Sequence, residues 1–251
     1  MMNSFESVIA LQKDSNLASS TIINIADLTA NPESYDFFTF RPNLEKLILA
    51  GKADTQHISI LWYTVLNGQV ESHYHDKTES VYVIKGTQTD NKGTYPTDSL
   101  YFNPPGSSHK ISNSSGFFIL AYASPPDFAN TNDIADYTPV YINTAVPNLE
   151  ESYPFTEVQN GVLRYDIPLV PEGGMSALFI KITSPESYQY TGNYLLVITG
   201  SCTIDGIAHD EKLLIVSKSI EPQSYQIKTT EGHSCLCLGL SFTNTHIQQS
   251  V

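Results

Sequence analysis

The sequence predicts an all-β protein, and three features indicate this class. Short runs of apolar, β-branched and aromatic residues recur between clusters of Gly, Pro, Asn and Asp, as in β-sandwiches and small barrels. The 251 residues include 15 Tyr and 11 Phe but only 16% charged residues, a composition that favours strands around an apolar interior. A run in the second half also repeats one in the first half, which indicates two related domains.

The first half is expected to form a series of strands separated by turns. Residues 22–30 predict a short strand or a turn of helix. Longer strands are predicted at 34–41, 44–51, 57–66, 81–84, 99–103 and 117–123. Asn67 and Gly68 predict a turn, Gly86 predicts a break, and residues 89–93 predict a polar hairpin.

The second half is expected to repeat this arrangement after a linker. Strands are predicted at 175–183, 194–198, 201–204, 212–217, 224–228 and 234–242. The run Leu-Leu-Val-Ile-Thr-Gly at 195–200 parallels Val-Tyr-Val-Ile-Lys-Gly at 81–86. The segment between the halves is rich in Pro, Asn and Asp, which favours an extended connection. We therefore predict a first domain at 1–125, a linker at 126–150 and a second domain at 151–251.

Candidate metal ligands stand close together in the first half. His73 and His75 form a His-x-His pair, which on a strand points both rings to the same face. Glu79 keeps the same parity, and His109 follows a stretch rich in Pro and Gly. The chain has seven histidines, and three of them lie in these two stretches. Three imidazoles and one carboxylate form a complete set of protein ligands for one divalent transition metal.

These residues resemble the two sequence motifs of the cupin superfamily. The first motif is written G-x5-H-x-H-x3,4-E-x6-G, and the residues that match its spacing are His73, His75, Glu79 and Gly86. The second is written G-x5-P-x-G-x2-H-x3-N, and its matches are Pro104, Gly106, His109 and Asn113. Two positions depart from the pattern, because Gly68 lies one residue too close to His73 and Asp98 replaces a glycine. The resemblance covers about residues 58–125.

The resemblance implies the fold and the site. It implies two tandem cupin barrels of the jelly-roll type, of which the second is degenerate. It also implies one bound divalent transition metal, Fe(II), Zn, Mn or Ni, with His73, His75, Glu79 and His109 as its ligands. The segment 103–109 is similar to a cupin subgroup that contains zinc-binding anti-sigma factors and small diketone-cleaving dioxygenases. This likeness implies a mononuclear-metal oxidoreductase of the dioxygenase type, which acts on a small oxygen-bearing organic substrate and has Glu79 available as a catalytic base.

A second function class competes with this enzyme hypothesis, and the sequence leaves open whether the protein is an enzyme. The alternative is a non-enzymatic cupin that binds or senses a ligand through its metal. An anti-sigma role is not expected, because that group carries an N-terminal zinc-binding domain and no His or Cys precedes His57 here. A sugar isomerase or epimerase is less supported, since phosphosugar enzymes need basic residues near the phosphate. Only four lysines stand near the motifs, at positions 77, 85, 92 and 110.

The second half is expected to lack metal ligands. The repeat sets Ser187, Gln189 and Asn193 against His73, His75 and Glu79, and it sets Tyr225 against His109. Hydroxyl, amide and phenol groups are poor ligands for Zn, Fe or Ni. His209 and His233 fall outside the ligand positions and are expected in loops or on the surface. The three cysteines at positions 202, 235 and 237 are expected to be reduced core residues.

The parity of the strands also predicts the wall of the cavity. Val81, Val83 and Ile111 should face inward with the ligands. Aromatic walls are expected from Tyr63 or Trp62 on one strand and from Phe118 or Tyr122 on another, although plain core packing would explain each of them. Arg41 is one of only two arginines; it either anchors an acidic oxygen of the substrate or forms a surface ion pair.

Charge and hydropathy exclude several classes of partner. The formal net charge is −13, with 13 basic residues and no basic patch, so nucleic acid is not an expected partner. No run reaches about 18 apolar residues, and the first residues lack the pattern of a signal peptide. A cytoplasmic location without membrane contact is therefore expected. The expected partner is a small-molecule substrate or ligand, and the expected state is a monomer or homodimer.

Overall fold

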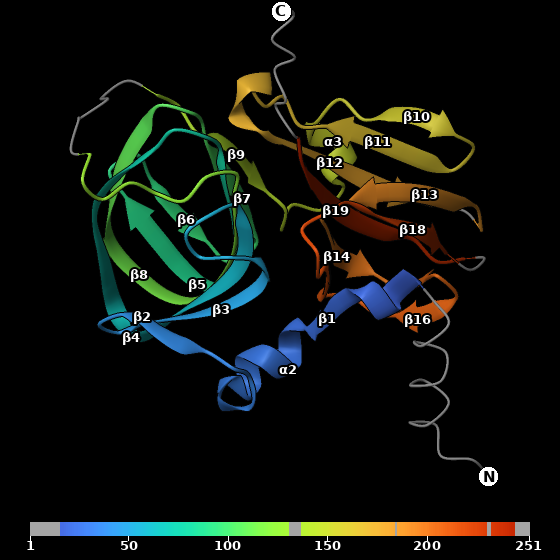
Figure 1. Cartoon of the computed structure of the whole chain (residues 1–251). Helices are drawn as coiled ribbons and strands as arrows, with labels where there is room; N and C mark the ends of the chain where they lie inside the picture. Colours follow the sequence, from blue (N-terminus) through green and yellow to red (C-terminus); the bar gives the residue numbers. More distant parts are fainter. Residues whose placement is uncertain (1–15, 131–136, 184, 230–231, 244–251) are drawn as a thin grey trace, which may run out of the picture. The chain divides into compact units, whose positions relative to one another are not determined.

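A computed structural model describes residues 16–130, 137–183, 185–229 and 232–243 of the chain. The all-β prediction is confirmed, since nearly all regular structure consists of antiparallel strands (Figure 1). The chain forms two compact units. The first unit comprises the described residues of 35–146, 168–176 and 242–243. The second unit comprises the described residues of 16–34, 147–167 and 177–241.

The elements of the first unit are strands and one short 3-10 helix. They are β2 (Phe38–Arg41), β3 (Leu44–Gly51), β4 (His57–His75), β5 (Glu79–Asp90), β6 (Thr94–Pro96), β7 (Ser99–Asn103), β8 (Ser107–Tyr122), β9 (Val140–Asn143) and η3 (Pro171–Gly173). The strands form one curled sheet in the order β2-β3-β4-β8-β5-β7-β9, and β6 pairs with β5.

The second unit contains short helices as well as strands. Its helical elements are η1 (Asn16–Ser19), α2 (Ile25–Ala30), η2 (Pro32–Ser34) and α3 (Leu149–Ser152). Its strands are β1 (Ser20–Asn24), β10 (Thr156–Gln159), β11 (Val162–Asp166), β12 (Met175–Ile182), β13 (Ser187–Gly192), β14 (Tyr194–Gly200), β15 (Cys202–Ile204), β16 (Ile207–His209), β17 (Leu213–Ser217), β18 (Gln223–Lys228) and β19 (Cys235–Phe242). They form two sheets, ordered β1-β17-β14-β19-β12-β11-β10 and β13-β18-β15-β16.

The two compact units exchange segments in a way that the boundaries expected at 125 and 151 do not describe. Strand β1 belongs to the second unit because it pairs with β17 over five residues, from Ser20 opposite Ser217 to Asn24 opposite Leu213. Strand β9 lies within the expected linker, yet it pairs with β7 in the first unit. Pairing between strands far apart in the sequence depends on register, which local patterns do not encode.

Two turn signals in the first half lie inside strands. Strand β4 continues through Asn67 and Gly68 to His75, so the turn expected there is wrong. A Cβ at Gly68 would lie 2.0 Å from the Tyr63 ring, so this glycine lets the strand pass over a buried aromatic side chain. Strand β5 likewise continues through Gly86, whose φ of +97° belongs to an irregularity in the ladder rather than to a strand end.

The core of each unit lies between its own strands. In the first unit the buried cluster includes Val81, Val83, Ile111 and Phe118, as the strand parity predicts. In the second unit the cluster combines side chains from both sheets, such as Leu195 of β14 and Ile227 of β18. Because the inward faces of these strands are buried, the strands keep their register and hold their inward side chains in fixed positions.

The backbone supports the predicted repeat. Gly86 of β5 and Gly200 of β14 both have positive φ, at +97° and +79°. A Cβ at either position would lie 1.9 Å from a carbonyl oxygen, that of Ser115 in the first unit and that of Ser234 in the second. The same close approach of backbones therefore occurs at the matching position of both halves. Among the residues that the structure describes, no helix is long and apolar enough to cross a membrane.

Candidate metal centre

Three paired strands bring the four predicted ligands together in the first unit. His73 and His75 lie at the end of β4, where His73 is directly opposite His109 of β8. Glu79 begins β5, which pairs with the opposite edge of β8. All four side chains are buried, with exposed fractions of 1–4%. One ligand atom from each residue lies within 4.8 Å of every other, so the group can hold a metal ion.

The shortest distances among these atoms match those of metal ligands. His75 Nε2 lies 3.2 Å from His109 Nε2. Glu79 Oε2 lies 3.4 Å from His75 Nε2 and 3.5 Å from His109 Nε2. Ligands bound at about 2.1 Å in a tetrahedral or octahedral shell are separated by about 3.0–3.4 Å from their neighbours. The three atoms therefore already have nearly the spacing that a common ion would impose.

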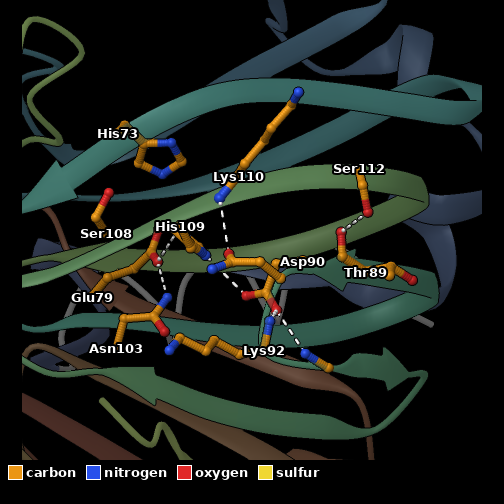
Figure 2. Close-up of polar contacts among 12 residues, drawn as sticks. His73, Glu79, Thr89, Asp90, Lys92, Asn103, Ser108, His109, Lys110 and Ser112 are labelled. Atoms are coloured by element: carbon orange, nitrogen blue, oxygen red, sulfur yellow. Dashed lines mark hydrogen bonds and ion pairs between the residues drawn. The ribbon is translucent and has the colours of Figure 1, made fainter. Parts of the chain in front are cut away.

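Hydrogen bonds to the outer nitrogens fix which ring atoms face the centre. His73 Nδ1 donates to the carbonyl oxygen of Glu71 at 2.8 Å. His109 Nδ1 donates to Asp90 Oδ2 at 3.0 Å (Figure 2). Because these partners only accept, Nε2 of both rings carries a lone pair and points to the same space as the Glu79 carboxylate. Acceptors that converge without a hydrogen between them repel one another, and a cation removes this repulsion. The residues present therefore fit a divalent metal.

Asp90 and Asn103 support the centre, and the sequence analysis missed both. Asp90 Oδ1 accepts from the backbone N–H groups of Lys92 and Gly93, so the hairpin tip holds the carboxylate that orients His109. Asn103 Nδ2 donates to Glu79 Oε2 at 2.7 Å (Figure 2). Both residues precede turns, and Asp and Asn are so common in turns that their identity carries no functional signal.

Replacing Asp90 with asparagine is expected to weaken metal binding by about 10–100-fold, because outer partners of metal-bound histidines have effects of this size. The amide would no longer offer a negative charge to His109 Nδ1–H. Competition with a chelator measures the affinity. Asp98→Asn is the control, since Asp98 accepts from the Tyr82 hydroxyl and is neither a candidate ligand nor the partner of one described above. Equal affinity in Asp90→Asn and wild-type protein would contradict the assigned role.

Burial keeps the His73 and His75 imidazoles neutral, which is the form that binds metals. Burial is the largest effect that lowers the pKa of His73 to about 3, and the neighbouring rings of His109 and His75 lower it further. The pKa of His75 is also well below its usual 6.5, mainly because the ring is buried and secondly because His109 is adjacent. These shifts disfavour protonation, so a metal ion does not compete with protons at neutral pH.

The metal-free protein is expected to lose stability as the pH falls from about 6.5 towards 3. In this window the unfolded chain protonates His73 and His75, whereas the folded protein does not. Because the unfolded state then binds more protons, the free energy of unfolding decreases, on the order of a few kcal/mol. Urea denaturation of chelator-treated protein between pH 7 and pH 4 measures the change. His73→Gln should flatten the dependence, and an unchanged slope in that variant would contradict the assignment.

A small cavity is lined by three of the four candidate ligands, His73, Glu79 and His109. Its volume is about 20 Å³, which is enough for one water-sized group. Tyr63 and Tyr122 lie in its wall, as expected, together with Ile111. Trp62 does not line it and instead stacks on Phe117 at a centroid distance of 5.5 Å. The remaining wall consists mainly of aliphatic and aromatic side chains, with Gln88 as a polar exception.

Phe128 covers the cavity beside Arg41. The centroid of the Phe128 ring lies 5.0 Å from that of the His73 ring. The Arg41 guanidinium carbon lies over the Phe128 ring, 3.9 Å from its centroid. Backbone hydrogen bonds between Asp127 and Tyr74 attach this segment to β4. Arg41 also lies 4.0 Å from the exposed carboxylate of Glu71. Of the two roles predicted for Arg41, the ion pair is therefore present, while its role towards a substrate stays a prediction.

A buried lysine lies on the other side of Tyr122. Lys46 is 2% exposed, and its ammonium group donates to His57 Nε2 at 2.8 Å. His57 is oriented by a hydrogen bond from its Nδ1 to the Thr55 carbonyl. Burial lowers the pKa of Lys46 to about 8, and the charge of Glu79 opposes this shift. Lys46 thus supplies positive charge close to a buried carboxylate, a feature that its isolated position in the sequence does not reveal.

Comparisons with known proteins agree with the motifs and the fold. Residues 26–125 match the family model described as a ChrR Cupin-like domain. No curated protein sequence is significantly similar to the chain. One similar solved structure is the Cupin 2 conserved barrel domain protein from Leptotrichia buccalis, with 11% identity, coverage of 89% of this chain and 96% of that chain, and a TM-score of 0.57.

A second similar structure is a mutant of salicylate 1,2-dioxygenase from Pseudoaminobacter salicylatoxidans in complex with gentisate. The identity is 10%, the coverage is 95% of this chain and 87% of that chain, and the TM-score is 0.51. At such identities these likenesses concern the fold. The family match over residues 26–125 therefore identifies a cupin-like domain in that part of the chain, and the similar structures show that the fold is that of cupin proteins.

Proposed function

We propose that this protein is a mononuclear metal-dependent oxidoreductase of the dioxygenase type, acting on a small oxygen-bearing organic molecule. The observation that carries the proposal is the convergence of His73, His75, Glu79 and His109, three of which line a mainly apolar cavity. These four residues would hold one divalent transition metal, and Fe(II) is the ion whose chemistry suits the proposal. When bound, such an ion supplies the redox chemistry that activates dioxygen and polarises substrate oxygens.

The residues around the ligands would position and shield the site. Asp90 holds the His109 ring in the orientation that points Nε2 inward. Asn103 holds the Glu79 carboxylate through its amide N–H. Glu79 is the candidate catalytic base, since its carboxylate can accept a proton from a bound hydroxyl or an acidic C–H when it is released from the ion. Phe128 and Pro126 would exclude water from the reaction.

The shape of the cavity limits the substrate class. The free volume of about 20 Å³ admits little more than a water molecule, so an organic substrate requires the Phe128 side chain to shift. The apolar wall disfavours phosphosugars and other strongly charged molecules. Compounds with two adjacent oxygens, such as β-diketones and hydroxyketones, combine an apolar body with a chelating end and suit both requirements.

Oxygen consumption tests the proposal. Protein loaded with Fe(II) is mixed with β-diketones, hydroxyketones and flavonol-like compounds, and oxygen uptake is recorded with an electrode. We expect uptake that depends on both substrate and Fe(II), with both atoms of O₂ recovered in the product, so that no external reductant is needed. Fe(II)-loaded His109→Ala should be inactive and Lys110→Ala active. Absence of uptake with every metal and compound would refute the enzyme proposal.

The small volume of the cavity also favours the second candidate, a metal-dependent cupin that binds or senses a ligand without turnover. A four-ligand tetrahedral zinc site has no open position and needs no room for substrate. Metal analysis of protein purified without added metal distinguishes the two. Stoichiometric zinc that resists dialysis, is lost in His109→Ala and leaves no exchangeable water position would support the sensing role and oppose the oxidoreductase.

A further inference from the structure

The second unit contains a cluster of three thiols that the proposed function does not use. Cys202 lies at the start of β15, and Cys235 and Cys237 lie on β19. None of the three forms a disulfide, and their exposed fractions are 5%, 2% and 0%. The three Sγ atoms lie within 4.8 Å of one another.

The distances among the sulfur atoms suit one shared ion. For three atoms with no separation above 4.8 Å, a point exists within about 2.8 Å of all of them. Zinc–sulfur bonds are about 2.3 Å long, so each sulfur needs to move inward by about 0.5 Å or less. A rotation about one side-chain bond of cysteine covers this distance. The strands themselves therefore need not move.

His209 lies next to Cys202, but neither of its ring nitrogens is within 4.8 Å of all three sulfur atoms, so the ring must turn towards them to become a fourth ligand. In the hairpin of β15 and β16, His209 is the direct partner of Cys202, and side chains of directly paired residues lie on the same face of a sheet. Its Nε2 atom is buried and has no hydrogen-bond partner among the described residues. A buried nitrogen without a partner costs free energy, and coordination of a metal would remove this cost.

The cluster lies in the core of the second unit, and Cys202 is at a position equivalent to one in the cavity wall of the first unit. Gly86 and Gly200 make the same close backbone contact in the two units, so they mark equivalent positions. Two residues after each glycine come Gln88, which lines the first cavity, and Cys202. In the second unit Tyr190 and Tyr225 are directly paired on neighbouring strands, and their rings stack at a centroid distance of 6.4 Å. The thiols therefore occupy barrel positions that carry no ligands in the first unit.

We propose that Cys202, Cys235, Cys237 and His209 form a second metal site, specific for zinc. Three thiolates and one imidazole are a common ligand set of closed tetrahedral zinc sites. The surroundings are apolar, with Ile204 and Ile227 among the packed neighbours, so a low net charge is favoured. Zinc with three thiolates and a neutral imidazole leaves one negative charge, whereas monovalent copper leaves two. The site would stabilise the second barrel and would be separate from the centre in the first unit.

This proposal replaces the expectation that the second half is free of metal ligands. That expectation was based on positions equivalent to His73, His75, Glu79 and His109, where the repeat has lost its ligands. The thiols approach one another because β15 and β19, from the two sheets of the second unit, both point these side chains into the shared core. Cys202 is distant from the other two cysteines in the sequence, so its spacing gives no motif.

Metal analysis of the His109→Ala variant tests the proposal, because this variant removes the first centre. The full chain is purified under reducing conditions after growth with zinc, and bound zinc is measured by mass spectrometry. We expect about one equivalent per chain, which Cys202→Ala should abolish in the same background. Replacement of the zinc by Co(II) should produce an intense thiolate-to-metal charge-transfer band.

His209 and His233 provide a matched test and control, because Nε2 of His209 is buried whereas His233 is exposed. His209→Ala should lower the zinc affinity at least about 10-fold, whereas His233→Ala should leave it unchanged. The charge-transfer band reports on folded protein, and circular dichroism identifies a variant that fails to fold. Zinc-free His109→Ala protein that is folded, binding of monovalent copper alone, or a disulfide between Cys202 and Cys235 in purified protein would each overturn the proposal.

Discussion

Replacing His109 with alanine is expected to remove most of the metal bound in the first unit while the barrel stays folded. His109 supplies one of four converging ligand atoms and is 2% exposed. Its loss leaves three ligands and a cavity that water can enter. We expect the affinity to fall by about 100-fold or more, since even the loss of an outer hydrogen-bond partner costs 10–100-fold. The core of the unit is apolar and consists of residues such as Val81 and Phe118, so secondary structure should persist.

Lys110→Ala is the matched control for this variant. Lys110 is the next residue of β8, and its side chain is exposed on the outer face of the strand. Metal content is measured after dialysis against a weak chelator, and circular dichroism is recorded on the same samples. Zinc in the second unit must be subtracted, which the Cys202→Ala background achieves. Equal metal content in His109→Ala and Lys110→Ala would show that the four residues are not the ligands.

Replacing Gly86 with alanine is expected to cost about 4 kcal/mol or more of folding free energy. Its φ of +97° is unfavourable for any other residue, and the new Cβ would lie 1.9 Å from the carbonyl oxygen of Ser115. The clash involves backbone on both sides, because Gly86 is paired with Gly116 of β8. Relief of this clash would require β5 and β8, the strands that hold Glu79 and His109, to separate. Decreases of this size in the free energy of unfolding are rare among single substitutions, and they occur where the surrounding backbone cannot relax around the new side chain.

Gly206→Ala separates the clash from the conformational cost. Gly206 also has positive φ, at +81°, but no atom lies within 4 Å of its added Cβ. We expect this control to lose only about 1 kcal/mol. Gly200→Ala should resemble Gly86→Ala, since it would meet the Ser234 carbonyl at 1.9 Å. The midpoints of urea denaturation measure all three, and similar losses for Gly86→Ala and Gly206→Ala would contradict the role assigned to the close approach.

The sequence predicted the four candidate ligands because their signal is local. His73 and His75 share a strand face through the two-residue period, and Glu79 follows within the same stretch. His109 was identified from the Pro- and Gly-rich segment before it and from the resemblance to a cupin motif. The inward positions Val81, Val83 and Ile111 follow from the same parity and lie in the buried cluster. Strands such as β3 and β7 were also predicted with their observed bounds.

The supporting residues could not be found in this way because their partners are distant in the sequence. Asp90 meets His109, and Asn103 meets Glu79, only when three strands are aligned in register. Lys46 reaches His57 across two paired strands. The glycine at position 68 gave a misleading signal, because it is the neighbouring aromatic ring, and not a turn, that leaves no room for a side chain there. Local patterns cannot distinguish these two reasons for a glycine.

By itself, the sequence determined the all-β class, the internal repeat and the group of His73, His75, Glu79 and His109. These features depend on composition and on residue spacing within short stretches of the sequence. Only the tertiary structure decided the exchange of β1 and β9 between the halves, the partners Asp90 and Asn103, and the meeting of Cys202 with Cys235 and Cys237. The physical reason is that strand pairing is set by the burial of whole sheets, which brings side chains together without any fixed spacing along the chain.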